Sequence, residues 1–294
     1  MFSKASLSVV FDTNTFQPAH FELLANGPLL HLCKIGRIVP VYGHVFLEEV
    51  WRAYGNEGKR AHLVERWIPF IIETVDRFCE DFITIWHREL VQGHGRKTNI
   101  FMRPSRQASL LSSLRTVPAD GSWKAWHATQ RERAVEDSKR AAQREVSKDI
   151  RLEVADKLKA VGYSRQQHGG PVPFEQFARQ ELDRGGREFI EAKIVCHDPK
   201  AVANRWSRVK AAYPYFTTFI ENLTYMGYYA ATRPNDRIDL NAQADLDLMT
   251  HLRRADALVT TETGFMRNAF DDIWRPRGKV LFTSQEFADF IRKR

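Results

Sequence analysis

The chain has 294 residues, and 43% of them are hydrophobic, a share that is ordinary for a globular protein and excludes wholesale disorder. Its 44 Lys and Arg against 36 Asp and Glu give a net charge of +8, which favours a polyanionic partner without identifying one. Three scattered cysteines exclude a disulfide framework and a cysteine-cage zinc site, and no apolar stretch suits a membrane span or a signal peptide, so we expect a cytoplasmic protein with no membrane partner.

The N-terminal part of the chain alternates short apolar strands with helices. Residues 7–12 form a β-branched, apolar run that ends in Asp12, which is typical of a buried strand. We expect a helix over residues 17–34, a second strand over residues 36–43 between two glycines, and a helix over residues 45–54. This alternation predicts a parallel sheet with helices on its faces.

The C-terminal part repeats the alternation, and we expect Ser284 to cap its last helix. The expected elements are a helix over 244–254, a strand over 257–262, a strand over 279–283 and a helix over 284–293. The two ends together predict an α/β core formed by residues 1–55 and 236–294.

Residues 56–235 show little strand pattern and predict a large, mainly α-helical insertion, a place for a substrate or a partner to bind. Residues 124–160 contain no Gly or Pro and space their apolar positions as an amphipathic helix does, with a solvated charged face. An aromatic run over residues 213–229 has helical spacing, which favours core packing over a platform for stacking bases.

Four acidic residues fall where an α/β sheet places its ligands, beyond the carboxyl ends of the parallel strands. Asp12 and Glu262 end predicted strands, and Glu49 lies on the helix after the second strand. Asp245 begins the helix that precedes the strand ending in Glu262, and a helix and a strand of these lengths return the chain to the same edge. We therefore expect all four carboxylates to meet in one crevice.

Each of these positions has an alternative. Glu48 competes with Glu49, although the helical phase places Glu49 with the inward-facing apolar residues. Asp247 competes with Asp245 in the same way. Asp12 belongs to a sequence that also suits a simple turn, and Glu262 precedes Thr-Gly, which suits a solvent-facing turn.

Clustered carboxylates repel one another, and a hard divalent cation relieves that repulsion. A set of oxygen ligands without Cys or His favours Mg²⁺ or Mn²⁺ over Zn²⁺. Such ions activate water and stabilise charge in phosphoryl transfer. The sequence therefore predicts metal-dependent phosphate chemistry.

The segments VVFDTN (9–14), FLEEV (46–50), ADLDLM (244–249) with ADALVTTETGF (255–265), and VLFTSQEF (280–287), in this order, resemble the PIN domain. The resemblance implies a three-layer α/β core with a central parallel sheet, in which Asp12, Glu49, Asp245 and Glu262 are the catalytic and metal-binding residues. It also implies a Mg²⁺- or Mn²⁺-dependent ribonuclease that hydrolyses RNA to 5′-phosphate and 3′-hydroxyl products.

The resemblance gives supporting roles to Thr260, which matches the usual Thr of the turn, and to Asn14, which matches a frequent polar position; Asp247 is the neighbour of the third acid. Glu262 stands where the family usually has Asp, and the insertion is not part of the family pattern. A catalytically decayed RNA- or protein-binding module therefore stays open, as does a toxin-type nuclease controlled by an inhibitory partner. Assembly into a homo-oligomer also stays open.

The remaining candidates lie in the insertion. Arg96, Lys97, Arg103 and Arg106 form an acid-free basic loop that we expect to contact RNA phosphates. The sequence Cys-His-Asp at residues 196–198 has the residue types of a nucleophile and its base, but adjacent side chains rarely point at one another. A dehalogenase-type phosphatase would need a second Asp where this chain has Asn14.

Overall fold

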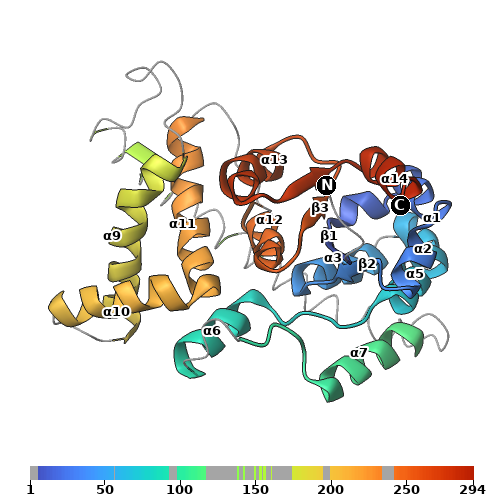
Figure 1. Ribbon diagram of the computed structural model, residues 1–294, viewed down its shortest axis with the longest axis horizontal. Helices are drawn as coiled ribbons and strands as arrows, with labels where there is room; N and C mark the ends of the chain where they lie inside the picture. Colours follow the sequence, from blue (N-terminus) through green and yellow to red (C-terminus); the bar gives the residue numbers. More distant parts are fainter. Residues whose placement is uncertain are drawn as a thin grey trace.

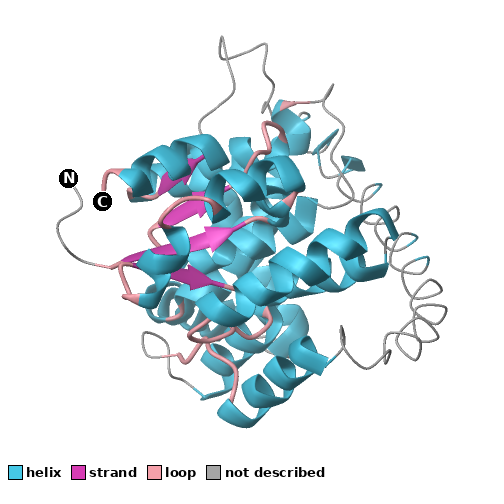
Figure 2. Cartoon of the chain, turned by 90° about the vertical axis from the view of Figure 1, so that its right-hand side faces the viewer, coloured by secondary structure: helices cyan, strands magenta, loops and turns pink. Residues whose placement is uncertain are grey.

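The computed structural model describes residues 6–55, 57–92, 98–116, 174–194, 199–233 and 242–294, with isolated positions between 138 and 160. A four-stranded sheet of order β2-β1-β3-β4 lies at its centre, enclosed by helices (Figures 1 and 2). Its strands are β1 (Leu7–Phe11), β2 (Ile38–Val41), β3 (Ala257–Val259) and β4 (Val280–Phe282). All three strand pairs are parallel, which confirms the predicted mixed α/β class.

The central strand β1 is covered on both faces. Val9, Val10 and Phe11 are all 0% exposed, so the run does not alternate between apolar and polar residues. A parallel sheet with helices on both sides demands such a continuous apolar run. In the register of the sheet, Val9 lies opposite Pro40 on one side and Ala257 on the other, which joins the two ends of the chain into one layer.

Helices form a layer on each side of the sheet. The helices of the N- and C-terminal parts are α1 (Pro18–Ala25), α2 (Leu29–Lys34), α3 (His44–Gly55), α12 (Ala242–Met249), α13 (Phe265–Ala269) and α14 (Ser284–Arg292). Short helical turns accompany them: η1 (Thr13–Phe16), η4 (Thr250–Arg253), η5 (Phe270–Trp274) and η6 (Arg275–Arg277). Figure 1 shows α1, α2 and α14 on one side of the sheet and α12 and α13 on the other.

Several element boundaries differ from the prediction. β3 ends at Val259, so Glu262, which was expected to end this strand, lies three residues beyond it. The expected helix over residues 17–34 is interrupted between α1 and α2, where Pro28 cannot continue a helical hydrogen-bond ladder. The last helix is capped by Thr283 and not by Ser284. The Thr283 hydroxyl accepts from the Glu286 backbone at 3.2 Å while the Glu286 carboxylate accepts from the Thr283 backbone at 2.8 Å, a complete capping box.

The described part of residues 56–235 is mainly helical, apart from isolated bridges that Phe78 makes with Tyr42 and Cys79 with Phe101. Its elements are α4 (Glu57–His62), the π-helical turn η2 (Leu63–Trp67), α5 (Ile68–Thr74), α6 (Phe82–Gln92), α7 (Pro104–Thr116), α9 (Phe174–Ile194), α10 (Pro199–Ala212) and α11 (Pro214–Thr232). The expected helix over 124–160 falls almost entirely outside the described residues.

The apolar core joins both parts of the chain. Trp67 and Phe70, from the predicted insertion, contact the Phe16 ring with centroids 5.4 and 5.9 Å away. A second apolar cluster lies between α9, α10 and α11 around Trp206 and Phe216. The predicted domain boundaries at 55/56 and 235/236 stay a prediction.

The aromatic run of α11 packs into the core, which confirms the expectation for residues 213–229. Tyr215, Phe216, Tyr225, Tyr228 and Tyr229 are all buried, so their ring faces are not available to nucleic-acid bases. In the described part of the chain, no helix combines the length and the apolar character that crossing a membrane requires.

Two adjacent glycines of α9 predict opposite effects on stability. A Cβ on Gly186 would lie 2.5 Å from the Trp206 ring, which is buried and held by a 2.9 Å hydrogen bond to Asp183. A Cβ on Gly185 would meet nothing closer than Ile220 at 3.9 Å. We expect Gly186→Ala to lower the free energy of unfolding by about 1–3 kcal/mol through overpacking.

The matched variant Gly185→Ala should raise the free energy of unfolding by roughly 0.5–1 kcal/mol, because Ala is the better helix former. Urea unfolding of both full-length variants measures the two values. Equal stability of the two variants would contradict the packing of Trp206 against α9.

Candidate functional site

The candidate site lies where the order of the sheet reverses. From β1 the chain first adds β2 on one side and later β3 and β4 on the other. Ligands of open parallel sheets bind beyond the carboxyl ends of the strands at such a point. Asp12 follows β1 directly and Thr260 follows β3 directly, so the two residues lie side by side at this edge.

A hydrogen-bond network ties the two strand ends together. The Thr260 hydroxyl donates to Asp12 Oδ2 at 2.7 Å, and the Asn14 backbone N–H donates to Asp12 Oδ1 at 3.4 Å. The Asn14 side chain accepts from the Thr261 backbone at 3.1 Å, and Thr260 Oγ1 accepts from the Glu262 backbone at 3.0 Å. The two residues predicted to support Asp12 therefore hold its carboxylate in place.

Asp12 is 6% exposed and carries an unfavourable negative charge. Burial raises its pKa to about 6, and the nearby charge of Glu49 adds to the rise, while the hydrogen bonds from Thr260 and Asn14 oppose it. Among the described residues, no Lys or Arg makes an ion pair with Asp12 or Glu49. Two carboxylates thus lie near one another with no ion-paired cation from the part of the chain that the structure describes.

Glu49 faces the same edge from helix α3. The hydroxyl of Thr13, the residue after Asp12, donates a hydrogen bond to Glu49 Oε2. Burial raises the pKa of Glu49, and the charges of Glu262 and Glu48 raise it further, while Thr13 and Arg52 act in the opposite direction. The structure thus brings Glu49 within electrostatic reach of both Asp12 and Glu262.

The fourth predicted acid, Asp245, is buried in the first turn of α12. Because α12 leads into the amino end of β3 through η4, its first turn lies toward the carboxyl edge of the sheet. Across the described ranges, no three His, Cys, Asp or Glu side chains are grouped closely enough to hold a metal ion. The shared metal site of all four acids therefore stays a prediction.

Glu48 and Asp247, the two alternatives, form a second acidic pair. Burial raises the pKa of Asp247 to about 7, with the Glu48 charge adding to the rise and a 2.9 Å hydrogen bond from Gln243 opposing it. Glu48 also lies 3.7 Å from His44 Nδ1. The prediction that Glu49, and not Glu48, approaches Asp12 agrees with these contacts, and Asp247 faces Glu48.

Buried His251 lies against Gly43, a contact that the sequence does not reveal. A Cβ on Gly43 would lie 2.3 Å from His251 Nε2, so only glycine fits where β2 passes into α3. Burial lowers the pKa of His251 to about 4, and the charge of His44 adds to the effect. His251 is therefore neutral at physiological pH.

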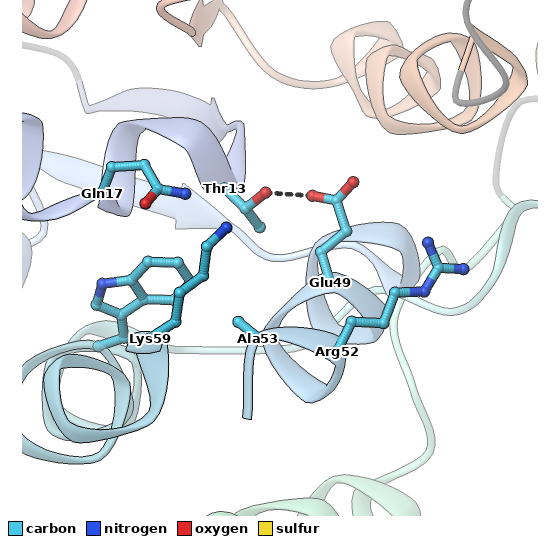
Figure 3. Close-up of a pocket in the computed structure, with 7 residues that line it drawn as sticks. Thr13, Gln17, Glu49, Arg52, Ala53 and Lys59 are labelled. Atoms are coloured by element: carbon cyan, nitrogen blue, oxygen red, sulfur yellow. Dashed lines mark hydrogen bonds between the residues drawn. The ribbon is translucent and has the colours of Figure 1, made fainter. Parts of the chain in front are cut away.

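A pocket of about 280 Å³ opens beside Glu49. It is lined by Thr13, Gln17, Glu49, Arg52, Ala53, Lys59 and Trp67. In Figure 3, Lys59 points into the pocket toward Thr13 and Gln17, while Arg52 points away from them on the far side of Glu49. The sequence does not reveal this pocket, because its lining depends on how α3, α4 and η2 pack together.

The basic loop of the insertion is only partly described. Arg96 and Lys97 lie outside the described residues, as do residues 196–198 with their Cys-His-Asp sequence. Arg103 is exposed. Arg106 pairs with Glu80 at 2.5 Å, and Glu80 is 2% exposed and also accepts from Arg88 at 2.8 Å. Arg106 therefore neutralises a buried carboxylate, which limits its freedom to bind RNA.

Comparison with known proteins gives no relative from which a function can be transferred, because no protein-family model, no curated protein and no solved structure matches this chain.

The raised pKa of Asp12 predicts a loss of stability as pH rises. The folded protein keeps the Asp12 proton up to its raised pKa of about 6, whereas the unfolded chain releases it near the ordinary pKa of 3.8. The free energy of unfolding therefore falls by about 3 kcal/mol as the pH rises between these two values. Asp12→Asn should remove this loss, because Asn does not ionise. The free energy of unfolding of the variant should therefore fall less between pH 4 and 7 than that of the wild type.

Urea unfolding across this pH range measures the effect in the full chain. Asp76→Asn is a suitable control because the Asp76 side chain is 80% exposed, and it should keep the wild-type profile. An Asp12→Asn profile that parallels the wild type would show that Asp12 ionises normally in the folded protein.

Proposed function

We propose that this protein is a Mg²⁺- or Mn²⁺-dependent ribonuclease with a PIN-like three-layer core. The observation that carries the proposal is a buried acidic site at the switch point of a parallel sheet. Asp12 and Glu49 lie there, and no Lys or Arg among the described residues forms an ion pair with either of them. Burial raises the pKa of both carboxyl groups, so their negative charges are unfavourable. The net charge of +8 suits a polyanionic substrate.

The residues fit a hard divalent cation in their chemistry. All donors are carboxylate oxygens, which Mg²⁺ and Mn²⁺ prefer, and a cation would lower the raised pKa values of Asp12 and Glu49. Asp12, Glu49 and Glu262 would hold the ion, with Asp245 as the fourth ligand. When bound, such an ion polarises the phosphate and makes water a better nucleophile.

The protein's own residues prepare the site for this role. Thr260 and Asn14 fix the Asp12 carboxylate and favour its charged form. Thr13, the residue after Asp12, donates a hydrogen bond that keeps the Glu49 carboxylate at the same edge of the sheet. Since no closed group of ligands exists among the described residues, binding an ion requires the longer side chains of Glu49 and Glu262 to turn toward Asp12. Both have the rotatable bonds to do so.

The absence of a closed ligand group in the described residues favours one alternative, a decayed PIN-like module that binds RNA or protein without cutting it. A toxin-type nuclease restrained by an inhibitory protein would use the same site as the proposed enzyme. The cleavage assay below separates the enzyme from the decayed module, because only the enzyme depends on both the acids and the ion.

Neighbouring glutamates on α3 provide a matched test of the site. Glu49→Gln and Asp12→Asn should each lower Mg²⁺- or Mn²⁺-dependent cleavage of a labelled single-stranded RNA by roughly 100-fold or more, because each removes a charged metal ligand. Glu48→Gln changes the same functional group one residue away, toward His44, and should keep cleavage near the wild-type rate. Cleavage by the wild type that survives EDTA would contradict a metal-dependent mechanism.

Glu262 tests whether a longer acid replaces the usual Asp. Glu262→Asp should keep measurable cleavage and shift the preference between Mg²⁺ and Mn²⁺, because Mg²⁺ demands stricter octahedral geometry. Glu262→Gln should lose more, because a neutral amide oxygen replaces a charged ligand. The measurement is the RNA cleavage rate of the wild type, Glu262→Asp and Glu262→Gln with each ion. Three equal rates would restrict the metal site to Asp12, Glu49 and Asp245.

A further inference from the structure

The pocket beside Glu49 joins the acidic site but has a different character. Thr13 and Glu49 belong to both, while Arg52, Lys59 and Trp67 add positive charge and an aromatic wall. We propose that this pocket binds one nucleotide of the RNA next to the phosphate that is cut, with its phosphate on Lys59, an inference that rests on the proposed ribonuclease function.

Within the described residues the two cations of the pocket have no ion-pair or hydrogen-bond partner, although the charge of Arg52 acts on Glu49. Lys59 and Arg52 are both exposed. Nearby basic residues differ: Arg60 donates to the Tyr54 carbonyl at 2.9 Å, and Arg66 pairs with Glu22 at 2.8 Å. Lys and Arg without partners form strong charge-assisted hydrogen bonds with phosphate oxygens.

The two cations lie in different positions. Figure 3 shows the Lys59 ammonium inside the pocket and the Arg52 side chain beyond Glu49. A phosphate on Lys59 would therefore lie within the pocket. Arg52 would contact the RNA strand where that strand leaves the pocket. The Gln17 amide and the Glu49 carboxylate, which also line the pocket, offer acceptors for the hydroxyls of a ribose.

Trp67 gives the pocket a rigid aromatic wall. It ends the π-helical turn η2, a type of turn that is frequent at functional sites. Its ring is held edge-on by Phe16 at 5.4 Å and by His62 at 6.2 Å. Its indole nitrogen is buried and has no hydrogen-bond partner among the described residues. Because Trp67 is only 2% exposed, it forms a rigid boundary of the pocket and offers no ring face on which a base could stack.

The size of the pocket limits its ligand. Its volume of about 280 Å³ is close to the lower end of the range for small-molecule sites, roughly 300–1,000 Å³. This space suits a single nucleotide and not a longer stretch of RNA. Because Thr13 follows Asp12 in the chain and holds Glu49, a nucleotide in the pocket would be adjacent to the acidic site.

Calorimetric titration of the full-length protein with adenosine 5′-monophosphate in EDTA tests this proposal without metal or cleavage. We expect saturable binding by the wild type and binding about tenfold weaker in Lys59→Met, because one charge-assisted phosphate contact is lost. Lys34→Met, a control whose exposed lysine ends α2 and does not line the pocket, should bind as the wild type does. Asp12→Asn should lose cleavage and keep nucleotide binding.

Absence of saturable binding by the wild type would overturn the proposal, and so would equal affinity in Lys59→Met. Inorganic phosphate that binds as tightly as the nucleotide would also overturn it, because the pocket would then recognise phosphate alone. Failure of the ribonuclease proposal has a different signature: the wild type would bind the nucleotide through Lys59 but would show no metal-dependent cleavage of RNA.

Discussion

The hydrogen bond from Thr260 to Asp12 is the interaction on which the candidate site depends. It joins the ends of β1 and β3 and holds a buried carboxylate that no described Lys or Arg neutralises. The bond favours the charged form of Asp12, whereas burial and Glu49 favour the neutral form, and burial has the largest effect. The protein therefore maintains an electrostatically unfavourable group at the place where its sheet opens, which is typical of functional sites.

Much of this arrangement follows from local sequence. The apolar run before Asp12 has to be a buried parallel strand, and the turn after β3 then brings Thr260 to the same edge. Helical phase alone placed Glu49 toward the core side of α3 and left Glu48 to another environment. The cap of α14 was misplaced by one residue, because Thr283 and Ser284 are both good caps and only the position of Glu286 decides between them.

The pocket and the His251 contact were beyond prediction because they depend on packing between distant segments. Trp67 reaches the pocket from the end of a π-helical turn, and no residue pattern marks that turn. Gly43 looked like a strand boundary, yet its lack of a side chain is what admits the His251 ring. Periodicity indicates which face of an element is buried but not which residue it meets there.

The pairing of β1 with β3 also decides when the protein acquires its acidic site. Val9 pairs with Ala257 in the sheet, and the Asp12 carboxylate accepts its hydrogen bond from Thr260. The two halves of the site are therefore separated by most of the chain. During translation, β1 and β2 leave the ribosome long before β3 exists, and the edge of β1 stays open meanwhile. The nascent chain thus cannot assemble the acidic site until synthesis has passed the third strand.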